Sequence, residues 1–338
     1  MNLYKSLIRP ILFLLEPETA QKFSEFALKR KLIWKISKNL FEYDSELLET
    51  NLAGIHLTNP IGLAAGFDKD CQLLSSLETF GFGYLTGGTI TREARPGNAQ
   101  PRMLRLNSQN GLINSLGFPG SGLQSAIKRL SKLPSVSKDS SKRILSISGT
   151  TEDDILYCHS AIEKFSSGIE INISSPNTAG LRIFQQPKNF RSLIEHVNEK
   201  RASPIIIKLP PFNAQLDDSD TNSILELINI CVDLDVDAVT AGNTHPVQDN
   251  RLAVGSGGLS GATIFDNTLA MVKKINKEFG SKIAINSCGG VSTGRQTHQL
   301  LRNGATTVQL YTSMVYEGPG LIKKIKKDLV EELLLESQ

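Results

Sequence analysis

Short apolar runs, most of them followed by a stretch with helical periodicity, recur along the chain from about residue 59 onward. Eight of these runs have the length and composition of buried strands. They cover residues 60–65, 84–89, 144–148, 169–174, 205–209, 238–241, 283–286 and 307–311. Helical spacing of apolar residues lies between several of them, at 152–165, 190–199, 220–234 and 265–279. Strands alternating with helices in this way predict a parallel (β/α)8 barrel, the TIM barrel fold.

The other α/β arrangement compatible with this alternation is a doubly wound open sheet. No Gly-x-Gly-x-x-Gly turn follows the first predicted strand, so nothing favours that arrangement. Residues 46–58 predict a small hairpin that introduces the barrel.

The first 41 residues combine apolar side chains at helical spacing with eight basic and three acidic residues, whereas the whole chain carries a net charge of only +3. Two short amphipathic helices separated near Pro17 fit this pattern. The first apolar run is far shorter than the ~20 residues that span a bilayer, so we expect the pair to lie on a membrane surface, with basic side chains toward anionic lipid. The alternative is a helix pair packed on the barrel with a solvated basic face. We therefore divide the chain into a helical segment, 1–45, and a barrel, 46–338.

Composition narrows the classes of function. With 338 residues, 40% hydrophobic and 21% charged, the chain is long enough for one large domain and is not disordered. The four cysteines are scattered, no two of the five histidines have zinc-motif spacing, and an export signal is not evident. These features predict a protein with free thiols in a reducing compartment, and neither a metal ion nor a nucleic acid as partner.

The most informative segment for chemistry is Asn172–Thr178, which gathers hydroxyl and amide groups directly after an apolar strand. Pro176 cannot donate to a sheet ladder, so the strand ends there. In α/β folds the carboxyl ends of the strands are where ligands bind. This turn is therefore a candidate active-site segment.

In a barrel the carboxyl ends of all eight strands meet at one mouth, which is here rich in amides and hydroxyls. The glycine pairs 257–258 and 289–290 let backbone N–H groups approach a phosphate, although Gly-Gly also occurs in ordinary turns. Lys69 and Lys208 follow or end apolar strands, where each could form a rim ion pair or hold an electron-rich ring. Amide donors and acceptors for a polar heterocycle come from four asparagines, Asn114, Asn172, Asn177 and Asn243.

Taken in their order along the chain, these residues resemble those of the dihydroorotate dehydrogenase family, and the resemblance covers nearly the full chain. The matching segments are 59–70, 95–98 with 101–102, 111–114, 117–118, 172–182, 257–261 and 308–311. The N-terminal helical pair resembles the extension of the class 2, quinone-reducing, membrane-associated members, and class 1 members usually have cysteine at the position of Ser175. The resemblance implies a peripheral membrane enzyme, on the cytoplasmic face of the inner membrane if the chain is bacterial.

The resemblance also implies FMN as cofactor and assigns roles to residues. FMN would be held by Ala65, Gly66, Phe67, Asp68, Lys69, Thr89, Ser148, Asn172, Lys208, Gly242, Gly261, Gly290, Tyr311 and Thr312. Dihydroorotate would be bound by Lys69, Asn114, Ser115, Leu116, Gly117, Phe118, Asn172, Asn177, Asn243 and Thr244. Ser175 would take the C5 proton while C6 delivers hydride to flavin N5, with desolvation and neighbours such as Thr178 assisting the serine. Electrons would leave to a quinone entering between the N-terminal helices, in the de novo synthesis of pyrimidines (UMP).

Several positions depart from the family pattern, among them the unusual Ser287-Cys288 pair before Gly289. Ser148 stands where asparagine is usual, Gly242 where threonine is common, and Ser115 where arginine often occurs. Each lost flavin hydrogen bond would cost about 1 kcal/mol, which weakens cofactor binding without abolishing it. Two other functions fit the barrel: an FMN enzyme that reduces a pyrimidine with a soluble partner such as fumarate or NAD, and a catalytically silent membrane-bound barrel. The retention of Lys69, Ser175 and the four asparagines disfavours the silent barrel.

Overall fold

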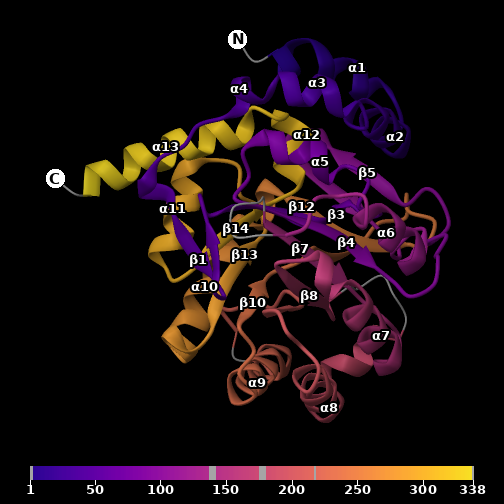
Figure 1. Cartoon of the computed structure of the whole chain (residues 1–338), viewed down its shortest axis with the longest axis vertical. Helices are drawn as coiled ribbons and strands as arrows, with labels where there is room; N and C mark the ends of the chain where they lie inside the picture. The colour runs from indigo at the N-terminus through magenta and orange to yellow at the C-terminus, as the bar shows by residue number, and fades with distance from the viewer. Residues whose placement is uncertain (1–2, 137–141, 175–179, 217, 337–338) are drawn as a thin grey trace.

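The computed structural model describes residues 3–136, 142–174, 180–216 and 218–336. Its centre is a closed barrel of eight parallel strands in the order β10-β13-β14-β3-β4-β7-β8-β9 (Figure 1). The strands are β3 (Ile61–Asp68), β4 (Tyr84–Ile90), β7 (Lys142–Ile147), β8 (Gly168–Asn172), β9 (Ile205–Lys208), β10 (Ala238–Ala241), β13 (Ala284–Cys288) and β14 (Thr307–Leu310). Around the barrel the strands follow their order in the sequence, and β14 pairs with β3 to close it. The predicted TIM barrel is therefore confirmed, and an open sheet is excluded.

The strands are buried on both faces, which is why they read as almost continuous apolar runs. In β9 every residue is buried, with Ile205 and Ile207 packed in the main hydrophobic core and Ile206 in a smaller cluster. The smaller cluster also contains Leu52, Ile55 and Leu57 of the predicted hairpin, formed by β1 (Thr50–Leu52) and β2 (Ile55–Leu57). This hairpin therefore packs against one end of the barrel.

Helices surround the barrel. They are α5 (Leu74–Leu77), α6 (Gly122–Leu130), α7 (Glu152–Ile162), α8 (Pro187–Asn198), α9 (Ser219–Asp233), α10 (Phe265–Phe279), α11 (Gly294–Arg302), α12 (Thr312–Glu317) and α13 (Leu321–Glu336). Several begin at a side chain that accepts a hydrogen bond from the first turn, as Thr151 does for α7 and Thr293 for α11. The helices predicted at 152–165, 190–199, 220–234 and 265–279 are all present.

A second sheet covers the carboxyl end of the barrel, and the sequence pattern did not predict it. It has four antiparallel strands in the order β11-β12-β6-β5: β5 (Met103–Leu106), β6 (Gly111–Asn114), β11 (His245–Gln248) and β12 (Ser256–Gly261). Two separate barrel loops contribute its strands, and β12 pairs with β6 from Gly258↔Asn114 to Gly261↔Gly111. This pairing fixes the loops that carry Asn114 and Gly261 relative to each other.

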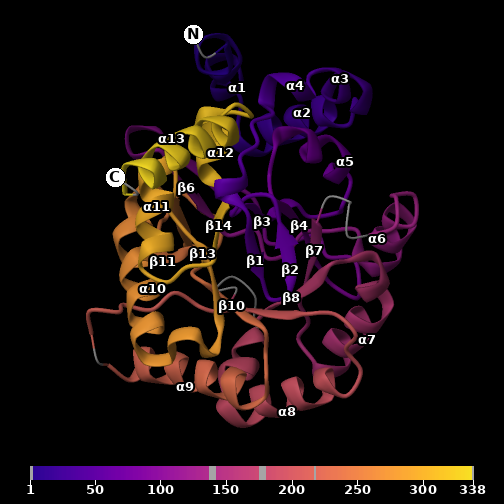
Figure 2. The same ribbon diagram turned by 60° about the vertical axis from the view of Figure 1, so that its left-hand side comes forward.

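The N-terminal segment folds into more pieces than the two helices predicted. A π-helical turn, Tyr4–Ile8, leads into α1 (Arg9–Leu14), followed by α2 (Pro17–Leu28), α3 (Lys31–Ile36) and α4 (Lys38–Phe41). These helices lie together at one end of the molecule, away from α8 and α9 (Figures 1 and 2). Among the helices of the described residues, none is both long enough and apolar enough to cross a bilayer.

Side chains join this helical segment to the barrel. The Arg102 guanidinium donates to Glu18 of α2 from Nε and Nη2, at 3.0 and 2.9 Å. The Tyr4 hydroxyl donates to the Val315 carbonyl of α12 at 2.7 Å, and Arg9 donates to the Tyr316 carbonyl at 3.0 Å. The helices are therefore held against the barrel by ionic and neutral hydrogen bonds.

Candidate active site

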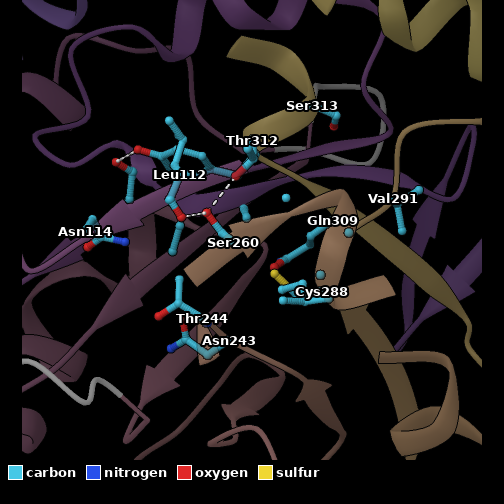
Figure 3. Close-up of a pocket in the computed structure, with 18 of the residues that line it drawn as sticks. Leu112, Asn114, Asn243, Thr244, Ser260, Cys288, Val291, Gln309, Thr312 and Ser313 are labelled. Carbon is cyan, nitrogen blue, oxygen red and sulfur yellow. Dashed lines mark hydrogen bonds between the residues drawn. The ribbon is translucent and has the colours of Figure 1, made fainter. Parts of the chain in front are cut away.

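A cavity of about 350 Å³ opens at the carboxyl ends of the barrel strands, beneath the antiparallel sheet. Its walls come from the barrel through Ala64, Thr89 and Gln309, and from the covering sheet through Leu112 and Ser260. Figure 3 shows residues of both layers around the same space, with Asn114, Asn243 and Thr244 on one side and Cys288, Gln309 and Val291 on another. Residues more than 200 positions apart in the chain thus meet in one site.

Amide and hydroxyl groups at one side of the cavity form a buried network. The Asn172 side chain donates from Nδ2 to Thr89 Oγ1 at 3.2 Å, and its Oδ1 accepts from the amide and hydroxyl of Ser174 at 3.1 and 2.9 Å. Asn243 donates to Ser174 Oγ at 2.7 Å, and the Thr244 amide donates to Asn243 Oδ1 at 2.8 Å. The network orients two of the cavity-lining asparagines, Asn172 and Asn243, and so presents amide groups of fixed direction to a ligand.

The other side of the cavity is built from glycines and hydroxyls. Gly261 has φ +109°, and a Cβ there would lie 2.3 Å from the Asn110 carbonyl oxygen. Gly290 has φ +75°, and a Cβ there would lie 2.5 Å from the Phe265 amide nitrogen. Only glycine fits either position, because neither the backbone conformation nor the space tolerates a side chain. Thr312 donates to Ser260 across this region at 2.8 Å (Figure 3).

Two of the lysines that line the cavity, Lys69 and Lys208, come from the barrel strand ends. Lys208 ends β9 and is only 4% exposed, whereas Lys69 follows β3 and is partly exposed. Burial by itself would lower the pKa of Lys208, but the attraction of Cys288, Glu170 and Tyr311 outweighs it and raises the pKa. Burial raises the pKa of the Cys288 thiol, so that neighbour is uncharged at neutral pH. The cavity floor therefore carries a fixed positive charge.

Two buried polar atoms with no hydrogen-bond partner in the described part of the chain belong to residues of the cavity wall. They are Gln309 Oε1 and Ser313 Oγ, both on residues that line the cavity. Buried polar groups are almost always paired in native proteins. An acceptor, a hydroxyl, a buried ammonium and glycine-lined backbone together fit a ligand with a polar ring at one end and an anion at the other.

Most residues expected to bind FMN or substrate lie on this cavity. They are Ala65, Gly66, Lys69, Thr89, Asn114, Leu116, Gly117, Phe118, Asn172, Lys208, Asn243, Thr244, Gly261, Gly290, Tyr311 and Thr312. Ser175 and Asn177 lie outside the described residues. Their assigned roles stay predictions.

Five other expected contacts do not line the cavity, namely Phe67, Asp68, Ser115, Ser148 and Gly242. Phe67 and Asp68 face a neighbouring cavity between α2 and the barrel. The Asp68 carboxylate accepts from the amides of Gln72 and Leu73, both at 2.8 Å, and so orders the turn before α5.

The remaining three are turned away for local reasons. The Ser148 hydroxyl donates to the Asn172 carbonyl at 2.8 Å, which fixes the strand end rather than a ligand. The Ser115 side chain is fully buried. Gly242 has φ +114°, and a Cβ there would lie 2.2 Å from the Cys288 carbonyl oxygen, so it serves a close approach of two chain segments.

Several lining residues were not singled out from the sequence. They are Met103, Asn110, Leu112, Gln309 and Ser313. Met103, Asn110 and Leu112 reach the cavity only because of the unpredicted antiparallel sheet. Gln309 did carry a signal, since a lone amide inside an otherwise apolar strand has to find a polar partner within the barrel.

Comparison with known proteins gives consistent matches. The family model described as dihydroorotate dehydrogenase matches residues 47–333. A dihydroorotate dehydrogenase (quinone) of Christiangramia forsetii is 31% identical over 98% of this chain and 99% of the relative, and one of Sulfurimonas denitrificans is 33% identical over 96% and 93%. Among solved structures, that of DHODH from Eimeria tenella in complex with ferulenol has a TM-score of 0.80 and 27% identity, and covers 95% of this chain and 93% of its own.

Proposed function

The chain belongs to the dihydroorotate dehydrogenase family, and from that premise we propose that it oxidises dihydroorotate to orotate with a quinone as electron acceptor. The observation that best supports this function is the cavity itself. It combines oriented asparagine amides, a buried lysine and a glycine-lined end within one space at the strand ends. The full-length relatives named as quinone-dependent enzymes support the choice of acceptor.

FMN is the cofactor that we propose for this cavity. Lys208, Lys69 and Gln309 would hold the flavin ring, and the backbone at Gly261 and Gly290 with Thr312 would hold the phosphate. Gln309 Oε1, which is buried without a partner in the described residues, would gain one from a ring N–H, and glycines at a strand end are typical of backbone that binds a phosphate. When bound, FMN accepts the two electrons of the oxidation and passes them on singly or in pairs.

The chain's own residues supply binding and proton transfer. We propose that Asn172 and Asn243, held in place through Ser174, bind the amide groups of dihydroorotate together with Asn114 and Asn177. Ser175, the residue after Ser174, takes the C5 proton. A serine is a weak base, so removal of water from the site has to raise its basicity.

The substitution Ser175→Ala tests the proton transfer. General-base catalysis contributes ~10²–10⁴ in rate, so bleaching of the flavin on anaerobic mixing with dihydroorotate should slow by that factor, while the Kd for orotate changes little. The matched control is Ser160→Ala on the exposed side of α7, which should leave the rate unchanged. Equal bleaching rates for Ser175→Ala and wild type would exclude Ser175 as the base.

We further propose that the N-terminal helices dock on a membrane surface, where a quinone is dissolved. Their large apolar side chains are exposed, with Leu14 at 87%, Leu32 at 71% and Ile36 at 76%. Lysines and arginines lie in the same segment, as expected for attraction to anionic lipid. An apolar surface of this extent next to basic residues is typical of peripheral membrane proteins.

Sedimentation with vesicles of anionic phospholipid tests the docking. The double variant Leu32→Glu/Ile36→Glu should bind these vesicles at least tenfold more weakly than wild type, because it places two carboxylates on the docking face. A matched control, Leu216→Glu/Val254→Glu, changes two exposed apolar residues of the barrel and should bind normally. Equal vesicle binding by both double variants would contradict docking through the N-terminal helices.

A further inference from the structure

A carboxylate lies fully inside the barrel, one layer below the candidate active site. Glu170 is in β8 with 0% exposure, two residues before Asn172 on the same face of the strand. Its Oε2 accepts from Thr240 Oγ1 at 3.0 Å, and its Oε1 has no hydrogen-bond partner in the described part of the protein. A buried carboxylate is costly unless a positive charge lies nearby.

The neighbouring strands place Lys208 one residue pair above this carboxylate, near enough for its charge to act on the lysine but not in an ion pair. Pairing of β9 with β10 sets Lys208 opposite Thr240, the residue that donates to Glu170. Pairing of β8 with β9 sets Lys208 opposite Asn172. The lysine therefore stands between Glu170 below and the cavity above.

Glu170 is the carboxylate among the groups that act on Lys208. The others are Cys288 from β13 and Tyr311 from the end of β14. Burial keeps the Cys288 thiol protonated. The remaining titratable neighbour of Glu170 is Tyr84 of β4, whose pKa burial raises further. Glu170 thus supplies the carboxylate that acts on Lys208.

Hydrogen bonds across the barrel hold the carboxylate in place. The Tyr84 hydroxyl donates to Asn286 Oδ1 at 2.7 Å, Asn286 Nδ2 donates to Thr240 Oγ1 at 3.0 Å, and Thr240 donates to Glu170. Each donor in this series has its acceptor on another strand. The position of Glu170 is therefore set by β4, β13 and β10 together.

We propose that Glu170 is a positioning residue that acts through Lys208: as its counter-ion, it keeps the ammonium charged and in place at the floor of the cofactor cavity. The consequence for chemistry rests on the proposed FMN site, because a fixed ammonium there stabilises the negative charge of the reduced ring. Without the carboxylate, and with the Cys288 thiol protonated, burial dominates and Lys208 loses its proton at a lower pH than in wild type.

The variant Glu170→Gln tests this without FMN. Glutamine keeps an acceptor for Thr240 and removes only the charge. If Lys208 then has a depressed pKa in the folded state, the unfolded chain binds more protons, so the free energy of unfolding of the apoprotein rises with pH between 7 and 10. Wild type should show no such rise, and Glu170→Gln/Lys208→Gln should lose it. Parallel pH dependences for Glu170→Gln and wild type would overturn the proposal.

The holoenzyme gives a second readout. In Glu170→Gln at alkaline pH, two-electron reduction of FMN should be accompanied by uptake of one additional proton on Lys208. The midpoint potential of this variant should therefore depend more steeply on pH than that of wild type. An unchanged slope would overturn the proposal. If Glu170→Gln does not fold, adding Lys208→Gln should restore folding, and a double variant that also fails would contradict the pairing. Failure of wild type to bind FMN would refute the proposed function, whereas the apoprotein comparison would still decide the role of Glu170.

Discussion

The glycine at position 261 allows a quantitative prediction about the cofactor end of the cavity. Gly261 has φ +109° and ψ −164°, a region that only glycine occupies readily, so alanine there costs about 1–3 kcal/mol of backbone strain. Its Cβ would also lie 2.3 Å from the Asn110 carbonyl oxygen and 2.7 Å from Gly111 Cα. Both are backbone atoms, so no side-chain rotation relieves the overlap, and overpacking adds about 1–3 kcal/mol. The total penalty for Gly261→Ala is then about 2–6 kcal/mol.

Part of this penalty should appear as weaker FMN binding, because the backbone that has to move, at Asn110, lines the same cavity. A loss of about 1.4 kcal/mol raises Kd tenfold, so we expect at least a tenfold rise, measured by the fluorescence of released FMN. The control is Gly54→Ala in the β1–β2 hairpin, where φ is +81° and a Cβ would meet no atom within 4 Å. It should cost about 1–2 kcal/mol of stability, the strain of a left-handed alanine alone, and leave Kd unchanged. Equal FMN affinity and equal stability for the two variants would refute the steric reasoning.

Three further perturbations have defined outcomes. Burial raises the pKa of Asp68 to about 6, so the folded protein holds a proton that the unfolded chain releases near pH 4. Stability in urea unfolding should therefore fall by ~2 kcal/mol between pH 4 and 6.5, and Asp68→Asn should remove that slope. Parallel slopes for the two proteins would contradict this. Glu18→Gln should lower the free energy of unfolding by about 1 kcal/mol in the same assay, because it weakens the largely buried bond to Arg102. The control Glu42→Gln, in the exposed pair with Lys38, should lower it by less than about 0.5 kcal/mol. Equal costs would contradict the docking role of Glu18. Ser174→Ala removes the hydroxyl that Asn172 and Asn243 share, which should cost about 1–2 kcal/mol and raise the Kd for orotate about fivefold to thirtyfold. The Kd is measured by titrating the flavin absorbance with orotate. An unchanged Kd would argue against the network.

The barrel could be predicted because its information is local. Runs such as Ile205–Lys208 are apolar over the length of one strand, and the helix after each run has its own periodicity, so both element types can be read within a window of about fifteen residues. Strand ends in a barrel converge whatever the loops do. For that reason residues as distant as Ala65 and Thr312 could be assigned to one site before the fold was known.

The parts that could not be predicted depend on contacts between distant loops. The β6 and β12 strands are short, and β12 contains three glycines, so each gains its conformation from the other rather than from its own sequence. The inward or outward direction of Asp68 and Ser148 was also not decidable, because a polar side chain at a strand end can bind either a ligand or a nearby backbone group. In the structure both side chains form hydrogen bonds with backbone groups.

The N-terminal segment shows the same limit. Its amphipathic pattern correctly indicated helices. It did not indicate the breaks after Leu14, Leu28 and Ile36, which depend on how the short helices are arranged on the barrel. Lys5 Nζ lies 2.9 Å from Glu317 Oε1 of α12. The two residues are more than 300 positions apart, so the local sequence pattern could not predict this ion pair.

The most direct test of dihydroorotate oxidation coupled to a quinone is a two-stage anaerobic experiment on the full-length protein. Purified enzyme is first mixed with one equivalent of dihydroorotate, and the flavin absorbance is followed; a water-soluble quinone analogue, fumarate or NAD⁺ is then added to separate portions. We expect the flavin to bleach in the first stage and its colour to return rapidly with the quinone alone. A flavin that stays oxidised with dihydroorotate, or one that is reoxidised by fumarate or NAD⁺ but not by the quinone, would contradict the proposed function.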